Sequence, residues 1–331
     1  MLSRKLGRTG PTVSAIGLGA MGMSTDWYGH ADEAEGLATI DAALEAGVTL
    51  IDTGDFYGMG HNEMLIGQAL KQGSKRDKAV LSVKFGGQRG PDGHWLGYAT
   101  DRNATRTALA YTLKRLRVDY IDIYRPARVS PLVPIEDTVG AIAELVKEGY
   151  VRHIGLSEAG ADTIRKAHAV HPIVDLQIEY AIMTRGVENK ILPVLRELGI
   201  GMTAYGVLSR GLISDSALAG GSRSGFRAMA PRFQGENLEQ NLKLVSALKA
   251  IADEKGCTVA QLAIAWVYAQ GEDIVPLIGA RKPARLAEAL GALDVTLTPA
   301  DMARIEAAAP TSAVAGTRYP AALIPSLDSE R

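Results

Sequence analysis

The chain has a single cysteine, Cys257, among its 331 residues. One cysteine excludes an internal disulfide and a metal site made of several thiolates, and it is typical of a reducing compartment. No apolar run approaches the ~20 residues that a membrane-spanning helix requires, and residues 1–7 have no apolar stretch typical of a cleaved signal. We therefore expect a cytoplasmic protein without a membrane partner or a metal site.

The sequence also lacks an excess of positive or negative charge. The 36 basic and 37 acidic residues leave a formal net charge of −1, so no overall field favours nucleic acid or an anionic membrane surface. The hydrophobic content of 47% is enough for a sizeable core. These totals predict an ordinary globular protein without a nucleic-acid partner, and they contain no signal that fixes an oligomeric state.

Short apolar strands and amphipathic helices alternate along the chain. The predicted strands cover residues 14–19, 49–52, 79–84, 120–124, 150–156, 173–178, 200–204 and 274–277. The predicted helices cover 32–46, 62–70, 101–116, 135–147, 161–169, 188–198, 237–255, 258–269, 283–291 and 299–308. Eight strand-helix units without a dividing linker predict an α/β fold, the (β/α)8 TIM barrel, as a single domain over residues 1–331. An N-terminal β-hairpin within residues 3–14 and extra C-terminal helices are expected to flank the barrel.

A doubly wound dinucleotide-binding fold is the alternative. Gly17 to Gly22 read Gly-Leu-Gly-Ala-Met-Gly, which fits G-x-G-x-x-G after a strand. In that fold the third glycine enters a helix directly, so that the helix N-terminus meets the pyrophosphate. Here Met23 to His30 intervene before the next predicted helix. The context favours the barrel, with the backbone near Gly19 and Met21 approaching a ligand at its mouth.

Two predicted strands end in ionisable residues. Asp52 ends one strand, with Tyr57 five residues later, and Lys84 ends the next. Strands of a barrel end on one face, so the three side chains could meet at one point. A lysine beside a phenol favours the phenolate and lowers the pKa of the tyrosine, while the aspartate holds the lysine. Each residue alone could be a structural loop residue; together they predict Tyr57 as an acid usable near neutral pH.

Two late stretches suit a phosphate-bearing ligand, which barrels often bind after strands seven and eight. Residues 205–211 offer an aromatic face and free amides, and residues 279–285 place three cations at a helix start. Cations there oppose the helix dipole, so an anion between them would relieve the conflict. Arg281 and Arg285, four residues apart, are expected on one face with the geometry for bidentate phosphate contacts. The residues expected around the ligand are Tyr205, Gly206, Leu208, Arg210, Gly279, Arg281 and Arg285.

The stretch 206–236 is rich in Gly, Ser and Arg and is long for an irregular loop. We expect it to fold over the pyrophosphate through Arg223, Arg227 and Arg232, and to be disordered without a cofactor.

Several motifs, in order, resemble those of the aldo-keto reductases over nearly the whole chain. They lie at residues 17–24, 52–58 (Asp-Thr-Gly-Asp-Phe-Tyr-Gly), 155–157, 177–180, 205–211, 231–237 and 279–288. The chain is similar to the bacterial branch related to the potassium-channel β subunits. The resemblance implies a (β/α)8 barrel that binds NADPH, or NADH more weakly, and reduces an aldehyde or ketone reversibly. It assigns Tyr57 as the acid, with Lys84 lowering its pKa and Asp52 paired to Lys84.

The resemblance also implies roles for the cofactor residues. Tyr205 would stack on the nicotinamide. The carboxamide would be bound by Ser157 and Gln177. The adenosine end would be held by Arg281 and Arg285 at the 2′-phosphate and by Glu288 at the adenine.

The chain departs from the family pattern at Ala127. The family usually has a catalytic His there, in a Gln-His-Arg-like run that reads Arg125-Pro126-Ala127-Arg128 here. That His donates to the carbonyl oxygen, and losing such a donor can cost ~10²–10³ in rate. A smaller residue could instead make room for a bulkier ketone, with water or a nearby side chain as the donor. His30, His61 and His94 lie in rim loops and could reach in, although a solvent-exposed loop position is the simpler interpretation.

Three smaller departures from the family pattern lie at positions that the resemblance assigns to cofactor binding. Glu158 stands where the family commonly has an Asn beside Ser157, which bears on one carboxamide contact. Ala289 replaces an Asn that contacts adenine, so cofactor binding is expected to be slightly weaker. Gly206 replaces a Ser whose contact is partly made by the backbone.

The candidate walls of the substrate pocket are Trp27, Tyr28, Phe85, Trp95 and Ala127. These residues favour a fairly apolar carbonyl compound over a small polar sugar. Two functions are then open. The Asp52–Tyr57–Lys84 set favours an NADPH-dependent carbonyl reductase. Ala127 leaves a cofactor-binding regulatory subunit with little turnover as the alternative, because channel β subunits also lack the His.

Overall fold

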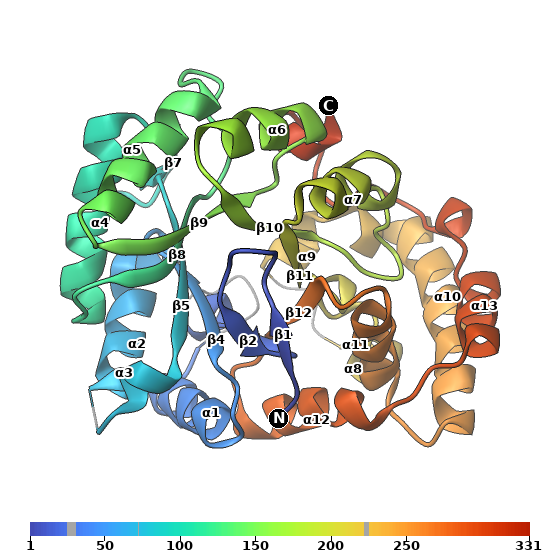
Figure 1. Cartoon of the computed structure of the whole chain (residues 1–331). Helices are drawn as coiled ribbons and strands as arrows, with labels where there is room; N and C mark the ends of the chain where they lie inside the picture. Colours follow the sequence, from blue (N-terminus) through green and yellow to red (C-terminus); the bar gives the residue numbers. More distant parts are fainter. Residues whose placement is uncertain (25–30, 72, 222–224) are drawn as a thin grey trace.

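The computed structural model of the chain describes residues 1–24, 31–71, 73–221 and 225–331. Eight parallel strands form a closed barrel in which each strand pairs with its neighbours in chain order (Figure 1). The strands are β3 Gly17–Gly19, β4 Leu50–Gly54, β5 Val80–Phe85, β8 Ile121–Pro126, β9 Val151–Ser157, β10 Ile173–Glu179, β11 Gly201–Tyr205 and β12 Ile274–Gly279. The predicted (β/α)8 barrel is confirmed, and the doubly wound alternative is wrong.

Helices surround the barrel on its outer side (Figure 1). They are α1 Glu33–Glu45, α2 His61–Leu70, α3 Lys75–Lys78, α4 Arg102–Leu116, α5 Ile135–Lys147, α6 Ala161–Val170, α7 Val187–Leu198, α10 Gly235–Glu254, α11 Val259–Ala269, α12 Pro283–Leu290 and α13 Pro299–Ala308. Side chains at the starts of several helices satisfy free backbone N–H groups. Asp32 accepts from the backbone of α1, Asp101 from that of α4, and Thr258 forms a capping box with Gln261. None of the helices in the described ranges is both long enough and apolar enough to span a bilayer.

The predicted N-terminal hairpin closes one end of the barrel. Strands β1 Ser3–Lys5 and β2 Thr12–Ser14 pair antiparallel and lie across the centre of the ring of strands (Figure 1). Leu6 and Val13 are buried in a small apolar cluster with residues from the barrel strands, among them Leu50 and Val174. Because these contacts fill the amino-terminal end of the barrel, a ligand has access from the other end, where the strands finish.

Three predicted segments differ in detail. Ser14 belongs to the hairpin, so the first barrel strand is the shorter β3. Residues 86–97, predicted as a loop from their glycines, contain a second hairpin of β6 Gly87–Arg89 and β7 Trp95–Tyr98. The irregular stretch 206–236 contains the short helices α8 Asp215–Leu218 and α9 Phe226–Met229 and the start of α10. Its predicted disorder without cofactor stays a prediction.

The glycine-rich segment after β3 does not start a long helix. Met21–Met23 form one 3₁₀ turn, and Gly22 therefore lies inside a turn and not at a helix N-terminus. This arrangement agrees with the interpretation of the Gly17–Gly22 motif as an irregular rim segment of the barrel.

Candidate active site

Tyr57 is held at the rim by a tight turn after β4. Gly58 (φ 56°), Met59 (φ 54°) and Gly60 (φ 94°) all have left-handed backbone conformations. A Cβ at Gly58 would also lie 2.5 Å from the carbonyl oxygen of Ser24. The left-handed conformation and the close approach of another segment both require glycine at position 58. This turn places Tyr57 directly beside the end of β4.

Asp52, Lys84 and Gln177 form a buried polar cluster beneath Tyr57. The Lys84 ammonium donates to Asp52 Oδ1 and, at 3.0 Å, to Gln177 Oε1. The Gln177 amide in turn donates to Asp52 Oδ2 at 2.7 Å. Lys84 Nζ lies 5.1 Å from the centre of the Tyr57 ring. The structure therefore brings the three predicted residues together and adds Gln177, whose amide bridges the Asp52–Lys84 pair.

The pKa of Lys84 is subject to opposing effects. Burial lowers the pKa of this lysine, and Arg125 and Arg128 also lower it, whereas the adjacent Asp52 carboxylate raises it. A buried ammonium without a counter-ion would lose its proton readily. The adjacent Asp52 carboxylate thus favours the charged form of Lys84 beneath the Tyr57 ring.

A second polar layer supports this cluster inside the barrel. Ser82 donates to Asp52 Oδ2 at 2.8 Å and accepts from Arg125, which is fully buried. Arg125 donates to Asp175 at 3.0 Å. A Cβ at Gly155 would lie 2.6 Å from Asp175 Oδ1, so only glycine leaves room for this ion pair. The Gly155 of the predicted motif is thus explained by the packing of buried charges.

A cavity of about 1350 Å³ opens at the carboxyl ends of the strands and includes the cluster. Most residues predicted for the cofactor line it: Gly19, Met21, Ser157, Gln177, Tyr205, Gly206, Leu208, Arg210, Arg227, Gly279, Arg281, Arg285 and Glu288. Asp52, Tyr57 and Lys84 line the same cavity. One continuous space thus connects the candidate proton donor with the basic segment after β12.

The basic end of the cavity differs from the prediction in one respect. Helix α12 begins at Pro283, so Arg281 precedes it and does not share a helix face with Arg285. Arg285 donates to Glu288 at 2.7 Å, and Lys282 pairs with Glu35 of α1 at 2.9 Å. The two arginines still line one cavity, because the loop after β12 leads directly into the helix.

The predicted arginines of the stretch 206–236 have separate positions. Arg210 pairs with Glu179 at 3.3 Å, and the Arg227 side chain donates to the Arg210 carbonyl at 2.8 Å; both arginines line the cavity. Arg232 instead donates to Thr184 at 2.7 Å and to the Gly316 carbonyl at 3.2 Å. Arg232 is therefore tied to the C-terminal tail, and Arg223 is outside the described residues.

An aromatic wall covers the other end of the cavity. Phe56 packs edge-on against Tyr57 (ring centres 4.8 Å apart) and Trp95 (6.0 Å), and Trp95 packs against Tyr98 (5.0 Å). The β6–β7 hairpin thus carries Trp95 to its predicted place in the pocket wall. The prediction for Phe85 is wrong, because its ring is fully buried and stacks on Tyr124 (4.4 Å) outside the cavity.

The prediction for Ala127 as a pocket wall is wrong as well, because this residue is almost fully buried and does not line the cavity. The other rim predictions divide into two groups. Trp27, Tyr28 and His30 lie outside the described residues. His61 accepts from or donates to Ser24 at 3.0 Å and His94 is exposed, and neither lines the cavity. Neither described histidine therefore replaces the imidazole that is missing at position 127.

Comparison with known proteins agrees with this geometry. Residues 15–310 match the Aldo/keto reductase family. The chain is 44% identical over 319 residues to "Probable aldo-keto reductase 1" of Glycine max, covering 95% of this chain and 91% of that protein. The chain belongs to the aldo/keto reductase family.

Solved structures support the same assignment. The glycerol dehydrogenase AKR11B4 from Gluconobacter oxydans superposes with a TM-score of 0.82 at 26% identity, covering 93% of this chain and 96% of that one. The aldo-keto reductase AKR11C1 from Bacillus halodurans, in its holo form, gives 0.77 at 25% identity, covering 94% and 97%. The protein is thus an oxidoreductase of a family that uses nicotinamide cofactors and acts on small-molecule carbonyl compounds.

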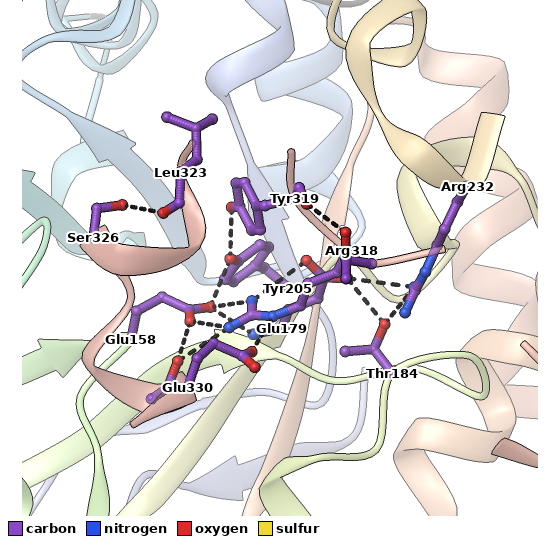
Figure 2. Close-up of polar contacts among 12 residues, drawn as sticks. Glu158, Glu179, Thr184, Tyr205, Arg232, Arg318, Tyr319, Leu323, Ser326 and Glu330 are labelled. Carbon is purple, nitrogen blue, oxygen red and sulfur yellow. Dashed lines mark hydrogen bonds and ion pairs between the residues drawn. The ribbon is translucent and has the colours of Figure 1, made fainter. Parts of the chain in front are cut away.

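Glu158, which stands where the family commonly has an Asn, forms a buried ion pair in this reductase. Arg318 of the C-terminal tail donates to Glu158 Oε1 at 2.9 Å and to Oε2 at 2.5 Å (Figure 2). Tyr205 and Ser329 each donate to the same carboxylate at 2.6 Å. Burial alone would raise the pKa of Glu158, but the hydrogen bonds and charge of Arg318, the charge of Arg128 and the hydrogen bond from Ser329 lower it to about 2. Both carboxylate oxygens of Glu158 therefore accept hydrogen bonds, from Tyr205 and from two residues of the tail. These bonds explain how a buried carboxylate is accommodated there.

The same tail brings an additional phenol to the reductase cavity. The Tyr319 hydroxyl lies 3.0 Å from that of Tyr205 (Figure 2), and Tyr319 lines the cavity. Burial, followed by the charge of Glu158, raises the pKa of Tyr205 well above its usual value of 10. Tyr205 is therefore a weaker acid than a free phenol, whereas the Tyr57 ring lies above the Lys84 ammonium.

Sequence reasoning missed Phe56, Tyr98, Arg128 and Tyr319 as cavity residues. Phe56 and Arg128 are direct neighbours of residues that were singled out, so they could have been found. Tyr98 requires knowledge of the β6–β7 hairpin. Tyr319 has no signal in the sequence, since the tail around it has no periodic pattern and reaches the cavity only through tertiary contacts.

Proposed function

We propose that this protein reduces an aldehyde or ketone to an alcohol with NADPH, and that Tyr57 gives the proton to the carbonyl oxygen. Lys84 favours the phenolate that remains, and Asp52 holds Lys84 in its charged form. The observation that carries the proposal is the buried Asp52–Lys84 pair 5.1 Å below the Tyr57 ring, in a cavity that extends to a basic segment.

The cavity fits a dinucleotide in size and in the chemistry of its ends. About 1350 Å³ exceeds the ~300–1,000 Å³ of common ligand pockets. Arg281 and Arg285 would hold the 2′-phosphate, Glu288 the adenine, and Tyr205 and Ser157 the nicotinamide end. When bound, the reduced nicotinamide supplies the hydride that the carbonyl carbon receives.

Gln177 has two interactions that bear on this proposal. Its amide already bridges Asp52 and Lys84 in the structure. It would bind the carboxamide only by sharing or exchanging these bonds. We infer that Gln177 contributes first to the position of Lys84 and second to the cofactor.

The preference for NADPH over NADH rests on the cations after β12. A 2′-phosphate carries charge that a ribose hydroxyl lacks, and charge-assisted hydrogen bonds to arginine are about twice as strong as neutral ones. Arg281 and Arg285 would supply this difference. The aromatic wall of Phe56, Trp95 and Tyr98 favours an apolar carbonyl compound as the substrate.

The test is the loss of NADPH absorbance with aldehydes and ketones of increasing bulk, each compared with NADH. Turnover with NADPH on bulky apolar carbonyls supports the proposal. Tight NADPH binding without turnover on any carbonyl would contradict it and support a cofactor-binding regulatory subunit.

A further inference from the structure

Arg128 is a cation in the wall of the active-site cavity that the mechanism above does not use. It follows β8 and lines the same cavity as Tyr57 and Lys84. In the family's Gln-His-Arg-like run the chain keeps this Arg and loses the His. The residue at the His position, Ala127, is almost fully buried and ends at its Cβ. No donor therefore remains at that position, while a guanidinium lies next to it.

The contacts of Arg128 leave part of its guanidinium available. Nη1 donates to the carbonyl oxygen of Ala127 at 2.6 Å, and Nη2 donates to the Tyr319 hydroxyl at 3.5 Å. The Nε atom is buried and has no hydrogen-bond partner in the described part of the chain. Each terminal nitrogen of the guanidinium carries two N–H groups and has one partner within the described ranges, so Nη1 and Nη2 are the atoms that can donate to a ligand oxygen.

Among the described residues, no carboxylate forms a direct ion pair with Arg128. Glu158 is the carboxylate whose charge acts on it. That carboxylate already accepts from Arg318, and from Tyr205 and Ser329. On the other side, the charge of Arg128 reaches Lys84, whose pKa it helps to lower after the larger effect of burial. Lys84 and Arg128 thus place two positive charges at the same region of the cavity.

We propose that Arg128 is a further catalytic residue: its guanidinium donates a hydrogen bond to the carbonyl oxygen of the substrate in place of the missing imidazole. This inference rests on the proposed reduction. As the carbonyl carbon gains a hydride, negative charge develops on the oxygen, and a fixed cationic donor stabilises it. Tyr57 gives the proton that completes the alcohol. Arg128 keeps all of its own protons, because a guanidinium does not ionise in proteins.

Tyr319 fixes the side chain for this role. Its hydroxyl lies between Arg128 and Tyr205, and Tyr205 in turn donates to Glu158. This chain of hydrogen bonds links the guanidinium to the anchored C-terminal tail. A long, flexible arginine side chain is thereby held in one position, as a preorganised donor must be.

The experiment compares wild type with Arg128→Met, Arg128→Lys and the double variant Ala127→His/Arg128→Met. Arg152→Met is the matched control, because Arg152 is an exposed arginine at the opposite end of the barrel that lies over the Tyr120 ring. The readouts are kcat and KM on an aldehyde that wild type reduces, the NADPH dissociation constant from fluorescence, and the pH profile of kcat/KM.

We expect Arg128→Met to lower kcat by about 10²-fold, with the NADPH dissociation constant unchanged within about twofold, as for the control. Arg128→Lys should recover part of the loss. The double variant should recover at least about tenfold and gain an ionisation near ~6.5, the usual pKa of histidine, which wild type lacks. Wild-type kcat in Arg128→Met, or no recovery in the double variant together with weaker NADPH binding, would overturn the inference.

A binding measurement keeps this test separate from the proposed function. Benzoate carries a carboxylate that can occupy the position of the charged oxygen. Calorimetric titration into the NADP⁺-loaded protein should show at least about tenfold weaker binding for Arg128→Met than for wild type and the control, as expected for loss of one charge-assisted bond. Equal benzoate binding in all three proteins would overturn the inference, whether or not any carbonyl is turned over.

Discussion

Arg318 and Glu158 form a buried two-point ion pair that joins the C-terminal tail to the end of strand β9. The Glu158 side chain is fully buried, and its backbone has a left-handed conformation (φ 52°). Asn adopts that conformation more readily than Glu, so the carboxylate is retained at some backbone cost. Glu158 accepts from Tyr205, whose hydroxyl lies 3.0 Å from that of Tyr319, and both tyrosines line the cavity. The tail is therefore part of the cavity wall.

Removal of one partner of this pair should destabilise the protein strongly. Arg318→Met leaves a buried carboxylate without its main counter-charge, which costs about 3–5 kcal/mol in the free energy of unfolding. Glu158→Gln/Arg318→Met should lose less than Arg318→Met alone, since no charge then remains unpaired. Urea denaturation of the wild type, both single variants and the double variant measures the coupling. Additive losses would show that the two residues do not act as a pair.

The stability of the protein should depend on the ionisation of Asp55. Its Oδ1 atom is buried without a hydrogen-bond partner in the described residues, and Oδ2 accepts from the Gly86 backbone at 3.2 Å. Burial raises the pKa of Asp55 from its usual 3.8 to about 7. A carboxyl with a raised pKa in the folded state binds a proton more tightly there than in the unfolded chain. The free energy of unfolding therefore falls as the pH rises from 3.8 to about 7, and stays low above that.

Asp55→Asn tests this dependence. The amide cannot ionise, so the variant should gain about 2 kcal/mol in the free energy of unfolding relative to wild type between pH 5 and pH 8. Chemical denaturation of both proteins at the two pH values measures the change. A stability difference that is the same at both pH values would show that Asp55 has an ordinary pKa.

The cations after β12 should discriminate between the two nicotinamide cofactors. Arg285→Met removes a charge-assisted bond to the 2′-phosphate and should weaken NADPH binding by about tenfold, with NADH binding unchanged. Arg304→Met is the control, because Arg304 forms an exposed ion pair with Glu254. Equal weakening of both cofactors would indicate that Arg285 contacts a part that they share. Fluorescence titration measures both dissociation constants.

The barrel and the core of the site could be predicted because one geometric rule places them. In a closed parallel barrel every strand ends on the same face, so Asp52 and Lys84 had to lie close together once the strands were recognised. The same alternation explains the error at Phe85. Successive residues of a strand point to opposite sides, so Lys84 faces the cavity and Phe85 packs against Tyr124 on the other side.

The C-terminal tail could not be predicted for a different reason. Arg318 and Tyr319 lie in a segment without helical or strand periodicity, and their cavity partners Glu158 and Tyr205 are more than 100 positions away in the sequence. No local pattern indicates which buried carboxylate such an arginine will meet. The sequence shows that Glu158 departs from the family pattern, but only the structure shows that Arg318 pairs with its buried charge.

The central claim, that Tyr57 is the proton donor, is tested most directly by Tyr57→Phe. Phe keeps the ring that packs against Phe56 and removes only the hydroxyl. The measurement is kcat for carbonyl reduction together with the NADPH dissociation constant. We predict that turnover is nearly abolished while NADPH binds as tightly as in wild type. A kcat close to the wild-type value would contradict the account, since another group would then have to protonate the carbonyl oxygen.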